Sequence, residues 1–137
     1  MNKHTYLRAY MAGIVVPTIF LLIVVTAFSL FRYVYNVPVP VERVIMFPMA
    51  VVPNLWGLWN ILFIALHAKH NLPIGLHGAV LPLILAPLGY MASRILDFSI
   101  PHVILAGFPI GIVVAVILYY LVWKHLVGFL NSVLAIA

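Results

Sequence analysis

Four long apolar stretches that contain no Asp, Glu, Lys or Arg divide the chain. They lie between Arg8 and Arg32, Arg43 and Lys69, Lys69 and Arg94, and Asp97 and Lys124. A helix rises about 1.5 Å per residue, so about 20 apolar residues cross a hydrocarbon core of about 30 Å. Each stretch is long enough to do so. The pattern predicts an all-α, polytopic membrane protein built as a bundle of four transmembrane helices.

Turn signals at the ends of these stretches set the expected bounds of the spans. Pro38 and Pro40 follow the first stretch, and Pro73 follows the second. Proline removes a helix hydrogen bond and restricts the residue before it. We expect spans near residues 10–34, 43–66, 75–96 and 101–124, all within a single membrane domain covering residues 1–137. Residues 126–137 are expected either to extend the last helix or to lie along the membrane surface.

Composition agrees with this fold class and excludes others. The chain is 66% hydrophobic and 7% charged, whereas soluble domains contain about 25% charged residues. Cysteine is absent, which excludes disulfides and thiolate metal sites. The net charge is +5, but the basic residues flank the spans. Membrane lipid is therefore the expected partner, and no binding of nucleic acid is expected.

The basic residues also give an expected orientation. One predicted side carries Lys3, Arg8, Lys69 and Lys124, and the other carries Arg32, Arg43 and Arg94. Because Lys and Arg collect on the cytoplasmic side, we expect a cytoplasmic N-terminus and an integral protein of the bacterial inner (cell) membrane. Glu42 is expected to neutralise its neighbour Arg43, and Asp97 is spaced to pair with Arg94.

Prolines lie inside all four expected spans. They are Pro17, Pro48, Pro53, Pro82, Pro87 and Pro109. Each leaves a carbonyl about one turn earlier without its usual donor, and in lipid that group needs another partner. We therefore expect proline-kinked helices, whose kinks either line a cavity or fit neighbouring helices to one another.

Small residues mark expected contacts between helices. The fourth span carries Gly107, Gly111 and Ala115 at intervals of four, a pattern that lets helix backbones approach closely in lipid. This stripe is expected either to pack the third and fourth spans together or to join two chains. The expected partners are accordingly a second copy of the chain or the other subunits of a membrane complex.

The second span has the most polar positions expected inside the membrane. At about 100° per residue, Trp56, Trp59 and Asn60 share one helix face, and Asn54 lies about 120° from Asn60. Two indoles and an amide are suited to a ligand pocket, with Tyr90 on the opposite wall. The favoured alternative is structural: the amides bond carbonyls released by nearby prolines and hold helices together.

Histidines gather on the predicted side of the N-terminus. The candidate metal or haem ligands are His67, His70, His77 and His125. Neutral imidazoles bind zinc, copper or nickel, and two imidazoles from separate helices can hold haem iron. Haem b between His67 and His125 is the most specific of these hypotheses. The favoured alternative is that these side chains are solvated at the interface and that no cofactor is bound.

Ionisable side chains are absent from the middle of every expected span, and no hydrolase or phosphate-loop motif occurs. The sequence therefore favours a helical module that is not an enzyme and that self-associates or serves as an accessory subunit around a lipid or another apolar ligand. Two alternatives stay open. One is a b-type haem or quinone-linked electron-transfer subunit of the membrane, and the other is a small oligomeric permease or channel lined by Asn54, Asn60 and Tyr90.

Overall fold

Helices make up nearly all of the computed structural model, which describes residues 4–136. The elements are α1 (Thr5–Tyr33), α2 (Val41–Val44), the π turn η1 (Ile45–Met49), α3 (Ala50–His70), α4 (Ile74–Ile95), α5 (His102–Val122), the π turn η2 (Trp123–Val127) and α6 (Gly128–Val133). Four continuous helical segments are long and apolar enough to cross a membrane: Thr5–Tyr33, Val41–His70, Ile74–Ile95 and His102–Val133. The predicted all-α fold with four membrane helices is confirmed.

The connectors end the helices by local backbone geometry. Asn36, Asn71 and Asp97 all adopt positive φ, the left-handed conformation that commonly ends a helix and that asparagine and aspartate tolerate. At the end of α3, the Asn71 N–H bonds the His67 carbonyl. Pro73 is extended and precedes the first turn of α4. The first helix begins at Thr5, earlier than the expected residue 10, and includes Arg8 in its first turns.

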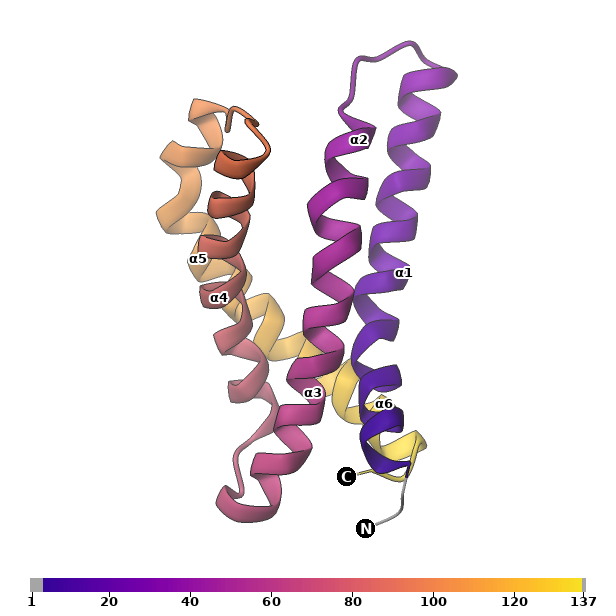
Figure 1. The fold of residues 1–137 in the computed structure, drawn as a ribbon, viewed down its shortest axis with the longest axis vertical. Coiled ribbons are helices and arrows are strands. Elements are labelled where there is room, and N and C mark those ends of the chain that lie inside the picture. The colour runs from indigo at the N-terminus through magenta and orange to yellow at the C-terminus, as the bar shows by residue number, and fades with distance from the viewer. Residues whose placement is uncertain (1–3, 137) are drawn as a thin grey trace.

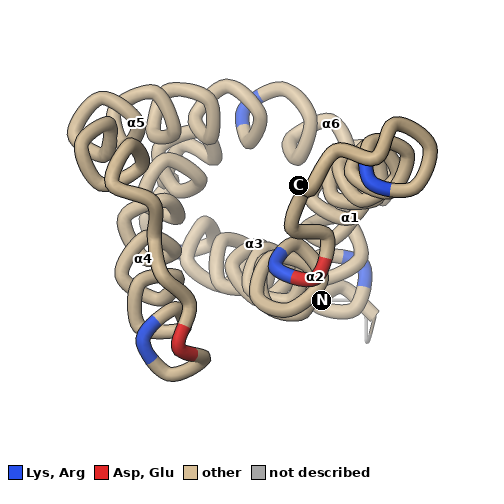
Figure 2. The backbone as a smooth tube through the Cα atoms, turned by 90° about the horizontal axis from the view of Figure 1, so that it is seen from above, with Lys and Arg blue, Asp and Glu red and all other residues tan. Residues whose placement is uncertain are grey.

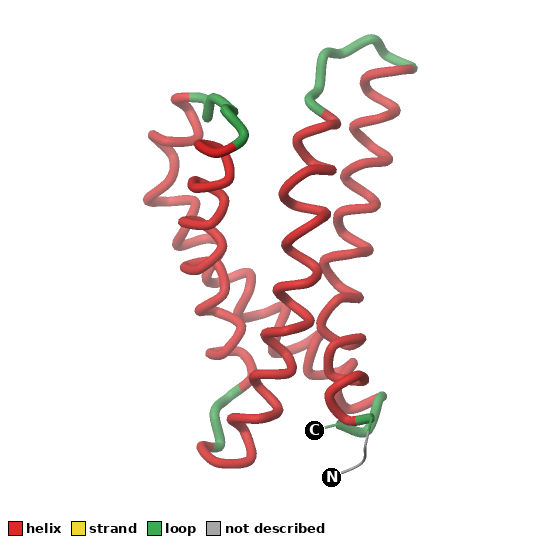
Figure 3. The backbone as a smooth tube through the Cα atoms, viewed as in Figure 1, coloured by secondary structure: helices red, strands yellow, loops and turns green. Residues whose placement is uncertain are grey.

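The four spans form two antiparallel pairs. Helix α1 lies along α3, and α4 lies along α5 (Figure 1). Viewed from above, the two pairs are separated (Figure 2). The helix formed by α5 and α6 begins beside α4 and ends beside α1, along one side of the molecule (Figure 2). Loops occur at the two ends of the bundle (Figure 3). We call the end with both termini and connector 71–73 the closed end, and the end with connectors 34–40 and 96–101 the open end.

The core lies toward the closed end. One cluster of buried side chains joins α3, α4 and η2 through Trp56, Leu81, Trp123 and Val127. A second cluster contains Ala9, Phe63 and Ile64, from the beginning of α1 and the second half of α3. By contrast, α5 contributes no buried residue. The helices therefore converge at one end of the molecule.

Two π turns interrupt the regular helices. Pro48 lies inside η1, and Lys124 and His125 lie inside η2. A π turn inserts an extra residue into a helix and shifts the faces of the two halves relative to each other. Beyond η2 the helix continues through Gly128 to Val133 because Val127 and Asn131 are buried against the rest of the bundle. Kinks at the prolines stay a prediction.

The charged residues at the open end pair differently from the expectation. Glu42 accepts a hydrogen bond from Arg32, across the α1–α2 connector, and not from its neighbour Arg43. The Arg43 guanidinium lies 5.4 Å from the centre of the Phe98 ring. Within residues 4–136 the Arg32–Glu42 pair is the one salt bridge, so the pair expected between Arg94 and Asp97 does not form.

Candidate functional site

A pair of buried amides ties the last helix to the bundle. Asn60 of α3 donates to the Asn131 side-chain oxygen at 2.8 Å, and Asn131 donates back at 3.0 Å. The Asn60 amide also donates to the Ala9 carbonyl of α1 at 2.7 Å. Both side chains are at most 1% exposed. Because both amides are buried and bonded across helices, the amide pair fixes α1, α3 and α6 relative to one another.

Trp59 and His77 form a reciprocal contact between α3 and α4. The Trp59 indole N–H donates to the His77 carbonyl at 2.9 Å. The His77 Nε2 lies 2.9 Å from the Trp59 carbonyl, and because a carbonyl only accepts, this contact assigns the imidazole proton to Nε2. The two rings stack with centroids 4.7 Å apart, and Phe63 and Trp123 also contact the imidazole.

Trp123 lies in the middle of the side chains that join the helices at the closed end. Its side chain is fully buried and lies against Gly78, where an added Cβ would be 2.0 Å from the Trp123 Cγ. The Trp56 ring lies 5.3 Å from the Trp123 ring. Neither of these two indole N–H groups has a hydrogen-bond acceptor in the part of the chain that the structure describes. The third-span glycine thus makes room for a tryptophan, as its small size allows.

A close backbone approach of α1 and α3 occurs at Gly13 and Gly57. A Cβ added at Gly13 would lie 2.6 Å from the Trp56 carbonyl oxygen and 2.8 Å from the Gly57 Cα. Sequence reasoning missed this contact. The signal was present, because Ala9, Gly13 and Pro17 recur at intervals of four in α1 and all three are buried.

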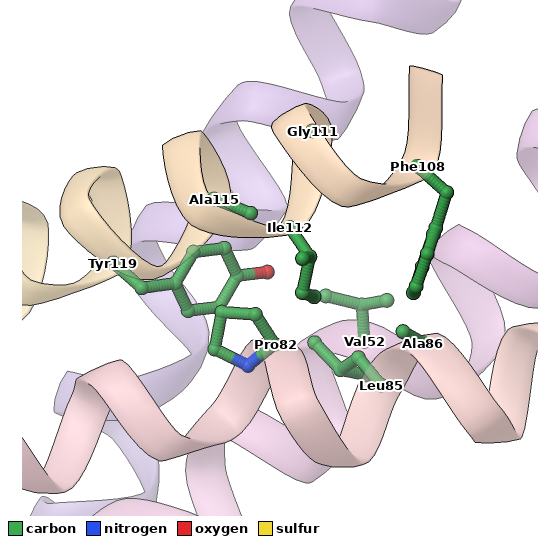
Figure 4. Close-up of a pocket in the computed structure, with 9 residues that line it drawn as sticks. All are labelled: Val52, Pro82, Leu85, Ala86, Phe108, Gly111, Ile112, Ala115 and Tyr119. Carbon is green, nitrogen blue, oxygen red and sulfur yellow. The ribbon is translucent and has the colours of Figure 1, made fainter. Parts of the chain in front are cut away.

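An apolar pocket of about 340 Å³ lies between three helices near the middle of the bundle. Its lining comes from Val52 of α3, from Pro82, Leu85 and Ala86 of α4, and from Phe108, Gly111, Ile112, Ala115 and Tyr119 of α5. Figure 4 shows the Tyr119 hydroxyl turned toward the space between α4 and α5. The pocket opens at the surface of the bundle, where Phe108 and Gly111 are exposed.

The two glycines of the small-residue stripe of α5 do not pack closely against another helix of the described chain. A Cβ added at Gly107 or Gly111 would meet no atom within 4 Å. Gly111 and Ala115 line the pocket, whereas Gly107 lies outside it. Of the two expectations for this stripe, the packing of the fourth span on the third does not use these glycines.

The residues predicted for a ligand pocket in the second span do not surround one cavity. Asn54 donates to the Ala50 carbonyl at 2.7 Å and accepts a hydrogen bond from Tyr10. Tyr90 is 54% exposed, and none of Asn54, Trp56, Trp59, Asn60 and Tyr90 lines the pocket described above.

Both amides link helices, Asn60 by donating to the Ala9 carbonyl and Asn54 by accepting from the Tyr10 hydroxyl, but neither bonds the carbonyl that Pro53 releases. Pro53 releases the carbonyl of Met49, four residues earlier, whereas Asn54 bonds Ala50 and Asn60 bonds Ala9.

The candidate histidines are dispersed over the closed end. His67 Nδ1 lies 3.2 Å from the Leu72 carbonyl oxygen, His77 is bound to Trp59 as described, and His70 and His125 are exposed. Among residues 4–136, no three His, Asp or Glu side chains are placed to hold one metal ion. Two imidazoles suffice for haem, so haem b between His67 and His125 stays a prediction.

The architecture and these contacts define the protein as a four-span, all-α membrane protein with a polar-linked closed end. No family model matches the sequence, and no match was found among curated proteins or solved structures.

Proposed function

We propose that the protein is a membrane module without enzymatic activity that self-associates through α5. The observation that carries the proposal is the bare α5 face: this helix buries no residue within the chain, and Gly107 and Gly111 meet no other atoms at their Cβ positions. In lipid, where the hydrophobic effect does not drive helices together, small residues favour association by allowing close van der Waals packing.

A second copy of the chain is the partner that fits this face best. The segment from Phe98 to Trp123 contains no charged residue, so two α5 helices can meet without burying an unpaired charge. Two-fold symmetry is the commonest symmetry of homo-oligomers. A two-fold axis at this contact would place the same glycines of the two copies opposite each other. A larger complex, with this chain as an accessory subunit, is the competing outcome.

Energy transfer between donor- and acceptor-labelled copies in liposomes tests the proposal. We expect wild-type chains to associate and Gly107→Leu to weaken association by about tenfold or more, because leucine prevents the close approach. Val113→Leu is the matched control, since Val113 is exposed and lies about 120° around α5 from Gly107, and it should associate like the wild type. Absence of energy transfer in the wild type, or equal effects of both variants, would contradict the proposal.

We further propose that the N-terminus is cytoplasmic and that the membrane is the bacterial inner membrane. By sequence, the side of the N-terminus carries Lys3, Arg8, Lys69 and Lys124, against Arg32, Arg43 and Arg94 on the other side, and the side richer in Lys and Arg is favoured to be cytoplasmic. Because the chain has no cysteine, His70→Cys and Tyr35→Cys each introduce a single thiol at an exposed position of opposite ends. In intact cells, an impermeant maleimide should label the second and spare the first; the reverse pattern would invert the orientation.

A further inference from the structure

The pocket between α3, α4 and α5 has an apolar wall and one polar end. No charged side chain is among its lining residues. The Tyr119 hydroxyl points into it (Figure 4), and the Tyr119 ring packs on Trp56 with centroids 5.0 Å apart. At the other end lies Phe108. An occupant therefore meets hydrocarbon along most of its length and a single hydroxyl at the end nearer the closed end of the bundle.

The depth of Tyr119 restricts the kind of occupant. Tyr119 precedes Lys124 by five residues, which at about 1.5 Å per residue sets its backbone about 7.5 Å along the helix from that basic position. Lys124 is exposed and its ammonium lies 5.7 Å from the Tyr120 ring centre, an arrangement suited to the membrane boundary. The hydroxyl is thus deeper than the charged headgroups of bilayer lipids, and a charged headgroup at Tyr119 would lie unpaired in hydrocarbon.

The size of the pocket also favours a small uncharged occupant. The pocket has a volume of about 340 Å³ and opens at the surface of the bundle. This volume limits the part of an occupant that lies between the helices, and it suits one aliphatic segment or one small ring system. Gly111 and Ala115 form part of the wall, and their small side chains are what leave the space open.

We propose that this pocket binds a neutral lipid with a single small head, such as a long-chain alcohol or a prenylated ring, whose hydroxyl or carbonyl oxygen hydrogen-bonds Tyr119. Self-association and this pocket share Gly111, which lines the pocket, whereas Gly107 lies outside it. Gly107→Leu therefore separates the two proposals, because it should weaken association and leave the pocket open. The apolar body of such a lipid would contact the apolar wall of the pocket, and the oxygen of its head would bond the Tyr119 hydroxyl.

Quenching of tryptophan fluorescence by a dibrominated long-chain alcohol tests this site in the full chain, reconstituted in nanodiscs of unbrominated phosphatidylcholine. Trp56 contacts Tyr119, and Trp59 and Trp123 belong to the same cluster of packed side chains. We expect a saturable phase above the linear quenching that partition into lipid causes. Tyr119→Phe should raise the half-saturating concentration between about twofold and tenfold, as loss of one hydrogen bond does.

Two variants that fill the pocket from opposite walls provide the decisive comparison. Ala86→Leu on α4 and Gly111→Leu on α5 should each abolish the saturable phase, so the test holds even where one of them fails to fold. Gly107→Leu is the matched control and should keep it. The proposal is overturned if a folded filling variant quenches like the wild type. It is also overturned if dibrominated phosphatidylcholine alone gives the same variant-sensitive quenching, which would assign the pocket to ordinary bilayer chains.

Discussion

The closed and open ends of the bundle are built from equally apolar helices but are held together differently. At the closed end, the amide pair of Asn60 and Asn131, the Trp59–His77 contact and the buried Trp123 connect helices that are distant in sequence. At the open end, the two helix pairs diverge (Figure 1), and α5 buries none of its side chains.

The residues of the closed end therefore stabilise the fold, whereas the exposed residues of α5 are available to contact lipid or another protein. Lipid chains are as apolar as the side chains themselves, so moving an apolar side chain from lipid to a helix interface gains little free energy. Buried hydrogen bonds and close packing therefore specify where helices meet. Variants at the closed end should therefore change folding, and variants on α5 should change association or binding while the fold persists.

The largest effect is expected at Gly78. In Gly78→Ala the new methyl would lie 2.0 Å from the Trp123 ring, and Trp123 is fully enclosed and cannot move aside. Overpacking of this kind costs about 1–3 kcal/mol or more. We expect a clear loss of stability in thermal unfolding, followed by circular dichroism in detergent micelles.

Gly107→Ala is the matched control for that experiment. Its methyl meets no atom within 4 Å, and alanine is favoured over glycine inside a helix by about 0.5–1 kcal/mol. This variant should unfold at or above the wild-type temperature. Equal destabilisation by the two alanines would mean that the two ends are packed alike, and the comparison would fail.

A smaller effect is expected at the amide pair. Asn131→Leu removes both hydrogen bonds between the two amides, so the Asn60 side-chain oxygen loses its partner and the Asn60 nitrogen keeps only the Ala9 carbonyl. Because side-chain hydrogen bonds in membranes contribute about 0.6 and at most about 1.7 kcal/mol, we expect a loss of about 1 kcal/mol in the free energy of unfolding. Steric trapping or reversible unfolding in mixed micelles measures it.

The double variant sharpens the interpretation. If the amides act on each other, Asn60→Leu with Asn131→Leu should cost less than the sum of the single changes, because no unpaired amide remains buried. Asn54→Leu is the comparison outside the pair, since Asn54 is exposed and bonds Tyr10 and its own helix. Strictly additive losses would show that Asn60 and Asn131 stabilise the closed end separately.

The sequence predicted the helices well and their contacts less well. Long uncharged stretches are sufficient to place four spans, since their length relates directly to membrane thickness. The proline and asparagine signals located the connectors. The first helix extends past the boundary expected at residue 10 because Arg8 lies within its first turns, where a long cationic side chain can reach the interface.

The pairing of small residues was not predictable from their spacing alone. Gly107 and Gly111 have the most regular pattern, but a Cβ added at either would meet no atom of residues 4–136 within 4 Å, whereas Gly13 and Gly57 bring α1 and α3 together. Spacing shows which backbones can approach closely, and the register of two helices, which depends on long-range contacts such as Asn60 with Asn131, decides which of them do. The pocket lining was missed for the same reason, since it combines residues of three helices.

The smallest effect is expected for the salt bridge of the open end. The Arg32 and Glu42 side chains are 37% and 65% exposed, and exposed ion pairs contribute little because water and salt screen them and because two flexible side chains must be held in place. Glu42→Gln should therefore leave the unfolding temperature unchanged within error at both low and high salt. A large, salt-independent drop would mean that this pair is shielded from water by lipid. In that case the open end would lie within the hydrocarbon, and its connector would be a fixed part of the fold rather than a loop at the membrane surface.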